Sequence, residues 1–579
     1  MPNMIQNAKD SISQILNAAY QKAAEKGELP SGAALSGTVE IPKGSANGDF
    51  AANHAMAGAK ALHMAPRKIA EALIANADLA DTWFASVEVA GPGFINFRLA
   101  DRWYADVLRA VTQEGADYGR SDIGHGQKVM VEFVSANPTG PMHMGNARGG
   151  VLGDALASVL DRAGYQVWRE FYVNDAGNQI EKFANSIDAR YQQLLLGEDQ
   201  VAFPEDGYHG DDIKDLAKLF YEANGDKYLT VPVAERHQAM AEFGLQRNIP
   251  KMQEDLRRYG IEYDQWFFES ELHESGYVAE SVQKLTDRGY TYEKDGALWL
   301  KTSQILTEQL LKAGKKQEEI DKLELKDDVL RRANGFYTYF AADIAYHRNK
   351  LEKRGFDKVI NVWGADHHGH VARLKGAMDA LGLDGEHRLD IVLMQLVKLT
   401  RNGEVVRMSK RTGKAISLTD LLDEIPVDAA RYFFNSRPES PVEFDLELAI
   451  RQDSENPVYY VQYAHARICT LLAALAAEGH TVPASADAAL LSTPEEKELI
   501  KQLAALPEEI RLAARDYDPS RINRYVTELA ARFHRFYTVC RIKGAESDVQ
   551  AARLLLADCV RRVIAVSLGI IGVTAPEKM

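Results

Sequence analysis

Apolar residues recur at helical spacing near the start of the chain and alternate further on. Ile12, Ile15, Leu16 and Ala19 lie three and four residues apart, and we expect this helix to begin at the capping residues Asp10 and Ser11. Farther on, the apolar segments 87–89 and 94–97 flank the turn Gly91-Pro92-Gly93. That arrangement predicts a β-hairpin.

The next segment reads as strand, helix and strand. The apolar run 129–134 predicts a buried strand, and Val151–Leu160 carries apolar residues at helical spacing. Gly164 ends this helix, and 165–173 predicts a second strand. A strand–helix–strand unit is the signature of a parallel sheet.

The rest of the chain divides into a mixed part and a helical part. Residues from about 185 to 330 are charged and mostly helical, with a strand-like stretch at 297–300, and we interpret them as an insertion. Strands return at 359–363 and 391–398, and from about 455 the pattern is that of a helical bundle. We therefore expect three domains, spanning 1–120, 121–454 and 455–579.

Composition narrows the class of protein. At 579 residues the chain is too long for a single core, and no apolar run is long enough to cross a membrane. Residues 1–10 lack the pattern of a secretory signal, and Cys469, Cys540 and Cys559 form no disulfide framework. These features predict a cytoplasmic protein with no membrane partner.

The net charge of −15 argues against nucleic-acid binding over the whole surface. The local balance differs: residues 501–562 carry 12 basic and 8 acidic residues, and residues 41–70 carry 4 basic and 1 acidic. Basic surface is thus confined to the two ends of the chain, where it fits either a solvated helix face or contacts with phosphates.

The first chemistry-bearing segment is Ser135–Asn146, which leads from the predicted strand into the predicted helix. A helix N-terminus offers free backbone N–H groups and attracts phosphate. His143 can donate to a phosphate oxygen, and Gly145 lets a nucleotide approach the backbone. The alternative is a Pro- and Gly-shaped turn with His143 as a cap.

The second segment, Arg407–Lys414, follows the 391–398 strand. Met408, Ser409 and Lys410 form a loop that can clamp a triphosphate while charge develops on it. Standing alone, the same residues would fit a solvated basic hairpin tip.

Together, the two segments resemble class I aminoacyl-tRNA synthetases, which hold ATP between a His-x-Gly-x motif and a Met-Ser-Lys loop across a Rossmann-type sheet. This chain has Asn146 where the first motif usually has His, and Arg407 where the second usually has Lys. We assign Arg407 no specific role. The resemblance implies an α/β fold with a parallel-sheet catalytic domain, a small N-terminal α/β domain and an all-α C-terminal bundle. It also implies the ATP-binding residues Pro138, Thr139, Gly140, His143, Gly145, Asn146, Met408, Ser409 and Lys410, of which His143, Gly145, Asn146 and Lys410 are catalytic.

Two acidic residues suit a guanidinium ligand, which needs carboxylates and neutral acceptors. Glu132 lies in the apolar strand before the first motif, where an unpaired carboxylate is costly. Tyr339 and Asp343 stand four residues apart, on one face if their segment is helical. A sheet-end glutamate facing water and an ordinary helix-surface pair are the alternatives.

Four longer stretches resemble the arginyl-tRNA synthetase family specifically: 131–141, 172–179, 339–347 and 363–370. The resemblance implies arginine contacts at Glu132, Asn137, Tyr339 and Asp343, with Ser135 near the amino and carboxylate end of the substrate. Asp366 or His367 is a further candidate. His367, His368 and His370 lack the spacing of a metal pair, and we expect them in a loop that contacts adenosine or substrate, with no tightly bound metal.

Both ends of the chain match the family's tRNA-binding domains. Phe50 and Asn53 are expected to contact the D-loop, and the C-terminal helices to bind the anticodon stem and loop through interleaved aromatic and basic residues. The C-terminal candidates are Tyr459, Tyr463, Arg467, Arg532 and Arg535.

The resemblance therefore implies an arginine–tRNA ligase that uses ATP with Mg²⁺, L-arginine and tRNA(Arg), and that acts as a monomer. Three alternatives are a class I synthetase for another amino acid, a small-molecule nucleotidyltransferase and a catalytically inactive tRNA-binding relative.

Overall fold

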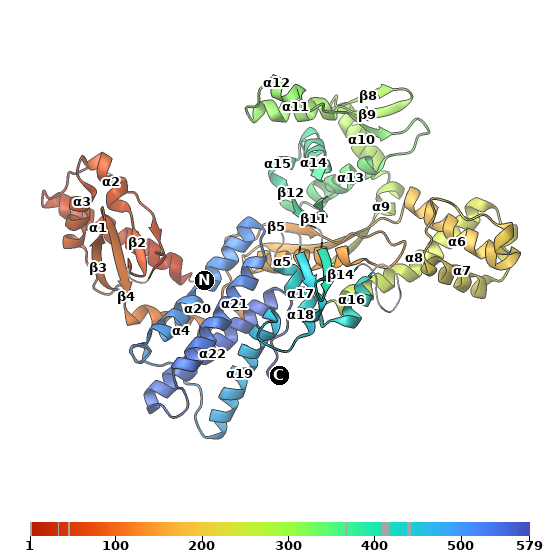
Figure 1. Ribbon diagram of the computed structural model, residues 1–579. Coiled ribbons are helices and arrows are strands. Elements are labelled where there is room, and N and C mark those ends of the chain that lie inside the picture. The colour runs from red at the N-terminus through yellow and green to blue at the C-terminus, as the bar shows by residue number, and fades with distance from the viewer. Residues whose placement is uncertain are drawn as a thin grey trace.

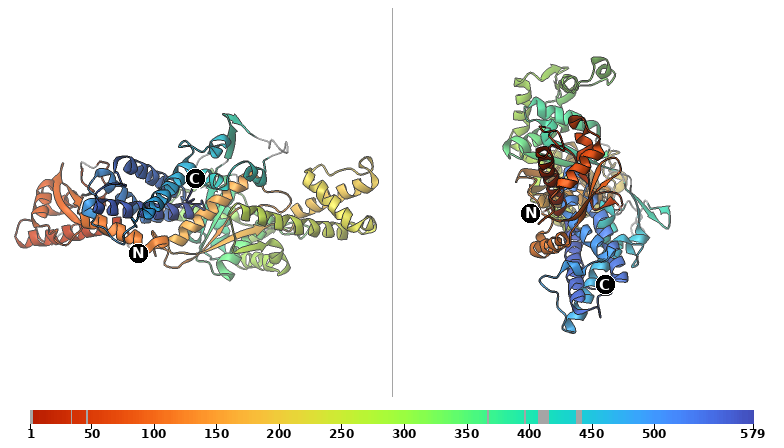
Figure 2. Two further views of the ribbon diagram at one scale, coloured as in Figure 1. Left: turned by 90° about the horizontal axis from the view of Figure 1, so that it is seen from below. Right: turned by 90° about the vertical axis from the view of Figure 1, so that its left-hand side faces the viewer.

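The computed structural model describes residues 3–32, 34–44, 47–365, 368–395, 397–406, 416–436 and 442–579. The molecule is elongated, with an N-terminal domain and a helical arm at opposite ends of a central sheet (Figures 1 and 2). A bundle of C-terminal helices packs beside the sheet. None of the described helices is long and apolar enough to span a membrane.

The N-terminal domain packs helices against an antiparallel sheet of order β1-β2-β4-β3. The predicted hairpin is confirmed, because β3 and β4 pair with Val87 opposite Phe97 and Val89 opposite Ile95. The predicted helix exists, but its expected caps are wrong: it begins at Met4, and the Asn3 side chain caps it by accepting from the Gln6 N–H (3.0 Å). The elements are α1 (Met4–Glu25), β1 (Val39–Glu40), β2 (Phe50–Ala52), α2 (His54–Leu62), α3 (Pro66–Asn76), β3 (Phe84–Ala90), β4 (Phe94–Leu99) and the connecting α4 (Asp101–Glu114).

The central sheet has five parallel strands in the order β12-β11-β5-β6-β7. Val129, Met130 and Val131 of β5 are fully buried, as expected for a strand covered on both faces. The strands are β5 (Lys128–Glu132), β6 (Gln166–Val173), β7 (Gln265–Phe268), β11 (Lys358–Gly364) and β12 (Leu389–Met394). The predicted strand–helix–strand unit is confirmed, with α5 (Met144–Arg162) as its helix. Because the chain order reverses between β5 and β11, a ligand site is expected at the carboxyl ends of these two strands.

The expected single insertion at 185–330 is wrong in one respect: β7 lies inside it and pairs with β6 in the central sheet. The segment is therefore two excursions. The first is the helical arm, α6 (Asn178–Leu196), α7 (Asp211–Asn224) and α8 (Val233–Arg258). The second comprises α9 (Glu269–Glu274), α10 (Tyr277–Asp287), β8 (Thr291–Lys294), β9 (Ala297–Leu300), α11 (Thr302–Lys312), α12 (Gln317–Asp321) and β10 (Asp328–Arg331).

The strand expected at 391–398 is in fact two strands. Its first part is β12 of the central sheet, whereas β13 belongs to a separate sheet of order β14-β13-β15. Between the second excursion and this small sheet lie α13 (Tyr339–Arg348), the π-helical turn η5 (Asn349–Lys353), α14 (His368–Ala380) and α15 (Gly385–Arg388). The remaining elements are β13 (Val397–Arg401), β14 (Glu404–Val405), α16 (Leu418–Glu424), α17 (Val427–Asn435), β15 (Val442–Asp445) and α18 (Leu446–Ile450).

The chain from 455 onward is helical, as predicted, with α19 (Pro457–Ala477), α20 (Pro494–Asp516), α21 (Ser520–Val539) and α22 (Ser547–Ile570). Arg431 of α17 joins this bundle to the sheet domain. Its fully buried guanidinium donates to the carbonyls of Ile571 (3.2 Å) and Tyr259 (3.0 Å) and pairs with Asp154 of α5 (2.5 Å). The helix that carries the first motif is thus tied to the end of α22.

Candidate active site

The backbone turns sharply where β5 ends. Val134 and Ser135 have positive φ angles of 69° and 44°, and the Ser135 N–H donates to the Phe133 carbonyl across Val134 (3.1 Å). A β-branched residue in this conformation is strained, and such strain is typical of functional sites. The turn lets Ser135 Oγ donate to Glu132 Oε1 (2.8 Å) and accept from the Tyr172 N–H (3.1 Å), so both side chains are fixed at the strand end.

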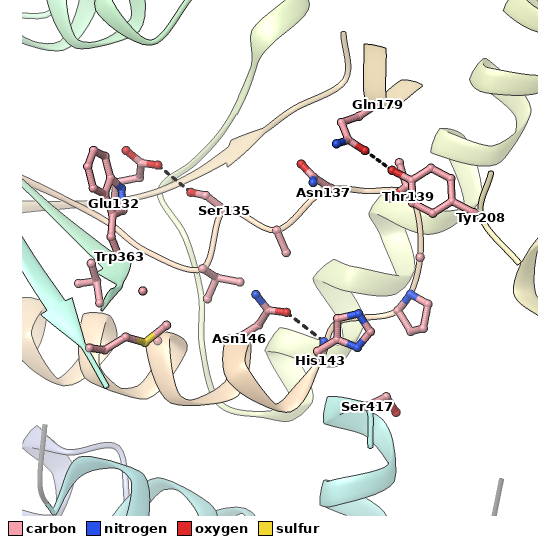
Figure 3. Close-up of a pocket in the computed structure, with 18 of the residues that line it drawn as sticks. Glu132, Ser135, Asn137, Thr139, His143, Asn146, Gln179, Tyr208, Trp363 and Ser417 are labelled. Carbon is pink, nitrogen blue, oxygen red and sulfur yellow. Dashed lines mark hydrogen bonds between the residues drawn. The ribbon is translucent and has the colours of Figure 1, made fainter. Parts of the chain in front are cut away.

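A cavity of about 910 Å³ opens at the carboxyl ends of β5 and β11. It brings together eight residues predicted from the sequence: Glu132, Ser135, Asn137, Thr139, Gly140, His143, Asn146 and Asp343. Figure 3 shows most of them facing the same space. Three other predicted residues, Pro138, Gly145 and Tyr339, do not line it.

The N-terminus of α5 forms one side of the cavity. His143 is the residue before the helix, its N–H donates to Asn146 Oδ1 (2.9 Å), and the first turn contains no acidic residue (Figure 3). Free N–H groups and the helix dipole therefore favour an anion here. Gly145 is exposed, and a Cβ added to it would meet no atom within 4 Å. The backbone at this point is open to a ligand.

The second motif, Arg407–Lys414, lies outside the described residues. The predicted residues Met408, Ser409 and Lys410, and also Arg407, belong to this part of the chain. The segment that follows it is described and returns to the first motif. The Met144 N–H donates to the Ile416 carbonyl (3.3 Å), the Leu418 N–H donates to the Met142 carbonyl (2.9 Å), and Ser417 lines the cavity. Residues 416–418 are therefore joined to the first motif by this pair of backbone bonds.

The two candidate carboxylates differ in their surroundings. Glu132 has a 7% exposed side chain and pairs with Lys350 Nζ (2.5 Å), which is fully buried. Asp343 is 26% exposed and lies 3.0 Å from His347 Nδ1 and 2.6 Å from His370 Nε2. Burial alone would raise the pKa of Asp343, but the hydrogen bonds from the two imidazoles outweigh it and hold that pKa well below its usual range.

Tyr339 and Asp343 both lie on α13, so the predicted helix is confirmed. Only Asp343 lines the cavity, however. The Tyr339 side chain is 44% exposed, and its ring lies beside Gly177, which precedes α6. Tyr339 is therefore a rim residue, one turn of helix from the carboxylate.

The histidine cluster was expected in a loop, but His368 and His370 belong to α14. His370 lines the cavity and contacts Asp343, whereas Asp366 and His367 lie outside the described residues. Within the described ranges, no group of three His, Cys, Asp or Glu residues has the geometry to hold a metal ion.

Sequence reasoning missed the part of the cavity wall that comes from the helical arm. Gln179 is the second residue of α6, and its side-chain oxygen accepts from the Tyr208 hydroxyl in the loop before α7 (Figure 3). Gln179 falls within the family-like stretch 172–179, so this resemblance could have identified it as a site residue. The arm residues of this wall are Gln179, Tyr208, His209, Gly210 and Asp212.

In the N-terminal domain the structure corrects the RNA contact expected at Phe50, whereas the contact expected at Asn53 stays a prediction. Phe50 is only 2% exposed and packs edge-to-face against Phe84 (6.4 Å between ring centroids), so it cannot stack on a base. The Asn53 side chain accepts from the Thr38 N–H (2.7 Å) and donates to Thr38 Oγ1 (2.8 Å), so its amide already serves the fold.

Three of the C-terminal candidates, Tyr459, Tyr463 and Arg467, form a ladder on α19 that reaches Tyr537 of α21. Tyr459 stacks on Tyr463 (6.1 Å, 7° between planes), and the Arg467 guanidinium lies 4.0 Å from the Tyr537 ring centroid. Arg532 instead pairs with Glu498 and Glu528 of the bundle (2.9 and 2.8 Å). Arg535 lines a small pocket beside these two glutamates.

A parallel sheet that reverses between β5 and β11, with a helix N-terminus beside the cavity at that point, is the ligand-binding arrangement of a Rossmann-type domain. The catalytic-domain model that matches residues 107–443 assigns this domain to the class I tRNA synthetases. Three family models match the chain: the arginyl-tRNA synthetase N-terminal domain (residues 6–99), the catalytic domain of class I (R) tRNA synthetases (107–443) and the DALR anticodon-binding domain (461–579). The chain belongs to the arginyl-tRNA synthetase family.

Individual relatives agree with the family models. The arginine–tRNA ligase of Acetivibrio thermocellus is 52% identical over 582 residues, which cover 100% of both chains. That of Caldanaerobacter subterraneus subsp. tengcongensis is 54% identical over 582 residues, again covering 100% of both. The solved arginyl-tRNA synthetase of Thermus thermophilus shares the fold (TM-score 0.73, 21% identity, covering 99% of this chain and 100% of that one).

Proposed function

We propose that the protein is an arginine–tRNA ligase. The observation that carries the proposal is the cavity that joins two carboxylates, Glu132 and Asp343, to the N-terminus of α5. Carboxylates suit a guanidinium, and a helix N-terminus suits the phosphates of ATP. One cavity therefore accommodates both substrates of adenylate formation.

In the first step, the carboxylate of arginine attacks the α-phosphate of ATP, which gives arginyl-adenylate and releases pyrophosphate. Asp343, Glu132 and Tyr339 hold the guanidinium, while Ser135 and Asn137 lie near the reacting end of arginine. His143, the Asn146 amide, the free N–H groups of α5 and Lys410 stabilise the charge that develops on the phosphates. Pro138, Thr139, Gly140, Gly145, Met408 and Ser409 complete the ATP site, and Mg²⁺ enters with ATP as part of the substrate.

In the second step, the 2′-hydroxyl of the terminal tRNA ribose attacks the adenylate and AMP leaves. The ladder of Tyr459, Tyr463 and Arg467, together with Arg535, is our proposed contact with the anticodon region, since exposed aromatic rings can stack on splayed bases. We assign the domains to residues 1–120, 121–454 and 455–579. We further propose that the protein acts as a monomer in the cytoplasm, which the three free cysteines support.

The test is ATP-dependent attachment of each labelled amino acid to total tRNA. We expect charging with arginine alone. Charging with another amino acid would identify a different class I synthetase, adenylate formation that never leads to charged tRNA would indicate a small-molecule nucleotidyltransferase, and tRNA binding without any turnover would indicate an inactive relative. Each of these results contradicts the proposal.

Substitution of His143 by alanine is expected to lower the kcat of adenylate formation by roughly 100-fold to 1,000-fold, as for the loss of one preorganised donor. The KM for arginine should change little, because His143 lies at the α5 N-terminus and the carboxylates lie at β5 and α13. Arginine- and tRNA-dependent exchange of pyrophosphate into ATP measures both constants. His480→Ala, at an exposed position after α19, controls for the loss of a histidine elsewhere. A raised KM with an unchanged kcat would place His143 at the arginine site instead.

A further inference from the structure

We propose that Arg373 and Lys350 are positioning residues that hold His370 and His347 as neutral hydrogen-bond donors to Asp343. The effect is to keep Asp343 charged and aimed at its ligand. The inference rests on the proposed function, because it takes the guanidinium of arginine as that ligand. Neither cation was singled out by the sequence.

The hydrogen bonds around His370 determine which of its nitrogens carries the proton. The Arg373 Nη2 lies 3.2 Å from His370 Nδ1, and a guanidinium can only donate. Nδ1 must therefore accept, which leaves Nε2 as the protonated nitrogen. Nε2 lies 2.6 Å from Asp343 Oδ2, so His370 donates to the carboxylate while its ring stays neutral.

The same reasoning applies to His347 through two further residues. Lys350 Nζ can only donate, and it lies 3.3 Å from the Asn361 side-chain oxygen. The Asn361 amide nitrogen is thereby directed at His347 Nε2 (2.6 Å), which Lys350 Nζ also approaches (3.5 Å). Nε2 must accept, so Nδ1 carries the proton: it donates to the Asp343 backbone carbonyl (2.9 Å) and also lies 3.0 Å from the Asp343 carboxylate.

The ion pairs around Asp343 leave one negative charge that suits a ligand with a single positive charge. Lys350 is offset by Glu132 (2.5 Å) and Arg373 by Asp328 (2.6 Å). Asp343 faces neutral donors and is the carboxylate left without a cationic partner in this described network. A ligand with a single positive charge, such as a guanidinium, completes it.

Among the described residues, few groups face the two imidazoles. His370 meets Asp343 from α13, Arg373 from α14 and the uncharged rings of Phe340 (5.2 Å) and Trp363 (5.6 Å), and Asp328 of β10 reaches it only through Arg373. His347 is 1% exposed and meets Asp343, Lys350, Asn361 and Tyr346. His370 is 22% exposed and Arg373 is 37% exposed. The contact between Arg373 and His370 is therefore the one that a substitution can remove without unfolding the site.

The experiment is the pH dependence of the arginine KM in the charging reaction, at saturating ATP and tRNA, from about pH 5.5 to 8.5. In Arg373→Met, no guanidinium donates to Nδ1 of His370, so this nitrogen can accept a proton as the pH falls. The imidazolium then neutralises Asp343. We expect the ratio of variant to wild-type KM to be near one at pH 8.5 and to reach about tenfold at pH 5.5.

Two further variants isolate the cause. Asp328→Asn removes the partner of Arg373 but keeps the donor, so its KM ratio should stay flat across the pH range. The double variant His370→Gln with Arg373→Met carries an amide that can donate to Asp343 but cannot titrate, so its ratio should be flat as well. A flat ratio for Arg373→Met alone, or a pH-dependent ratio for the double variant, would overturn the proposal. Failure of the wild type to charge arginine would instead contradict the proposed function.

Discussion

Replacing Asp343 with asparagine is expected to raise the KM for arginine by roughly 100-fold to 1,000-fold, with little change in the KM for ATP. Asparagine keeps the shape of the side chain and removes its charge. Loss of a charge-assisted hydrogen bond to a ligand that remains charged costs about 3–4 kcal/mol. The carboxylate stays ionised throughout the pH range of the assay, because its pKa lies well below the usual range.

The same variant should also lose discrimination against citrulline, which has the length of arginine but no charge. In the wild type, citrulline leaves Asp343 without a cationic ligand, whereas in Asp343→Asn both ligands meet a neutral amide. Competition by citrulline for arginine charging measures this change. Asp384→Asn, at an exposed aspartate paired with His387, is the matched control. An unchanged arginine KM in Asp343→Asn would show that the guanidinium binds elsewhere.

The sequence predicted the helices and strands whose apolar residues follow a clear local pattern. α5 and the β3–β4 hairpin show apolar residues at a spacing that matches the faces they bury, and β5 shows the unbroken apolar run of a strand buried on both faces. β7 was missed because Gln265–Phe268 is too short to show a period and lies between helices. Its strand conformation depends on pairing with β6, which is a tertiary contact.

The site likewise contains residues that the local sequence predicted and residues that depend on tertiary contacts. Glu132 was predicted because a carboxylate in an apolar strand needs a partner. Asp343 was predicted because it stands four residues from Tyr339, in a stretch that resembles the arginyl-tRNA synthetase family. Their partners were not predicted, because the Lys350–Glu132 contact joins residues 218 positions apart and depends on the register that sets Asn361 beside Glu132. The expected RNA contact of Phe50 was wrong for a different reason. An aromatic residue in the basic segment 41–70 fits an RNA-binding surface and a core equally, and only its burial in the fold decides between them.

Substitution of Lys350 by methionine is expected to destabilise the catalytic domain by about 3–5 kcal/mol, because it leaves Glu132 buried without its cationic partner. The side chain of methionine fills a similar volume, so a cavity contributes little. The shift of the catalytic-domain transition in urea measures the loss. Lys312→Met, at the end of α11, controls for removal of a lysine outside the network.

The double variant Lys350→Met with Glu132→Gln separates stability from binding. Removing both charges of a buried pair is often neutral for stability, so the double variant should recover most of the free energy of unfolding lost by Lys350→Met. Its arginine KM should nevertheless stay at least tenfold above that of the wild type, because the Glu132 carboxylate is gone and Nε2 of His347 has lost one of its two donors. Additive losses of stability from the two single substitutions would mean that Glu132 and Lys350 do not stabilise each other. Recovery of both the arginine KM and the stability would mean that the Glu132–Lys350 pair stabilises the fold only, and that Asp343 binds the guanidinium without help from Glu132.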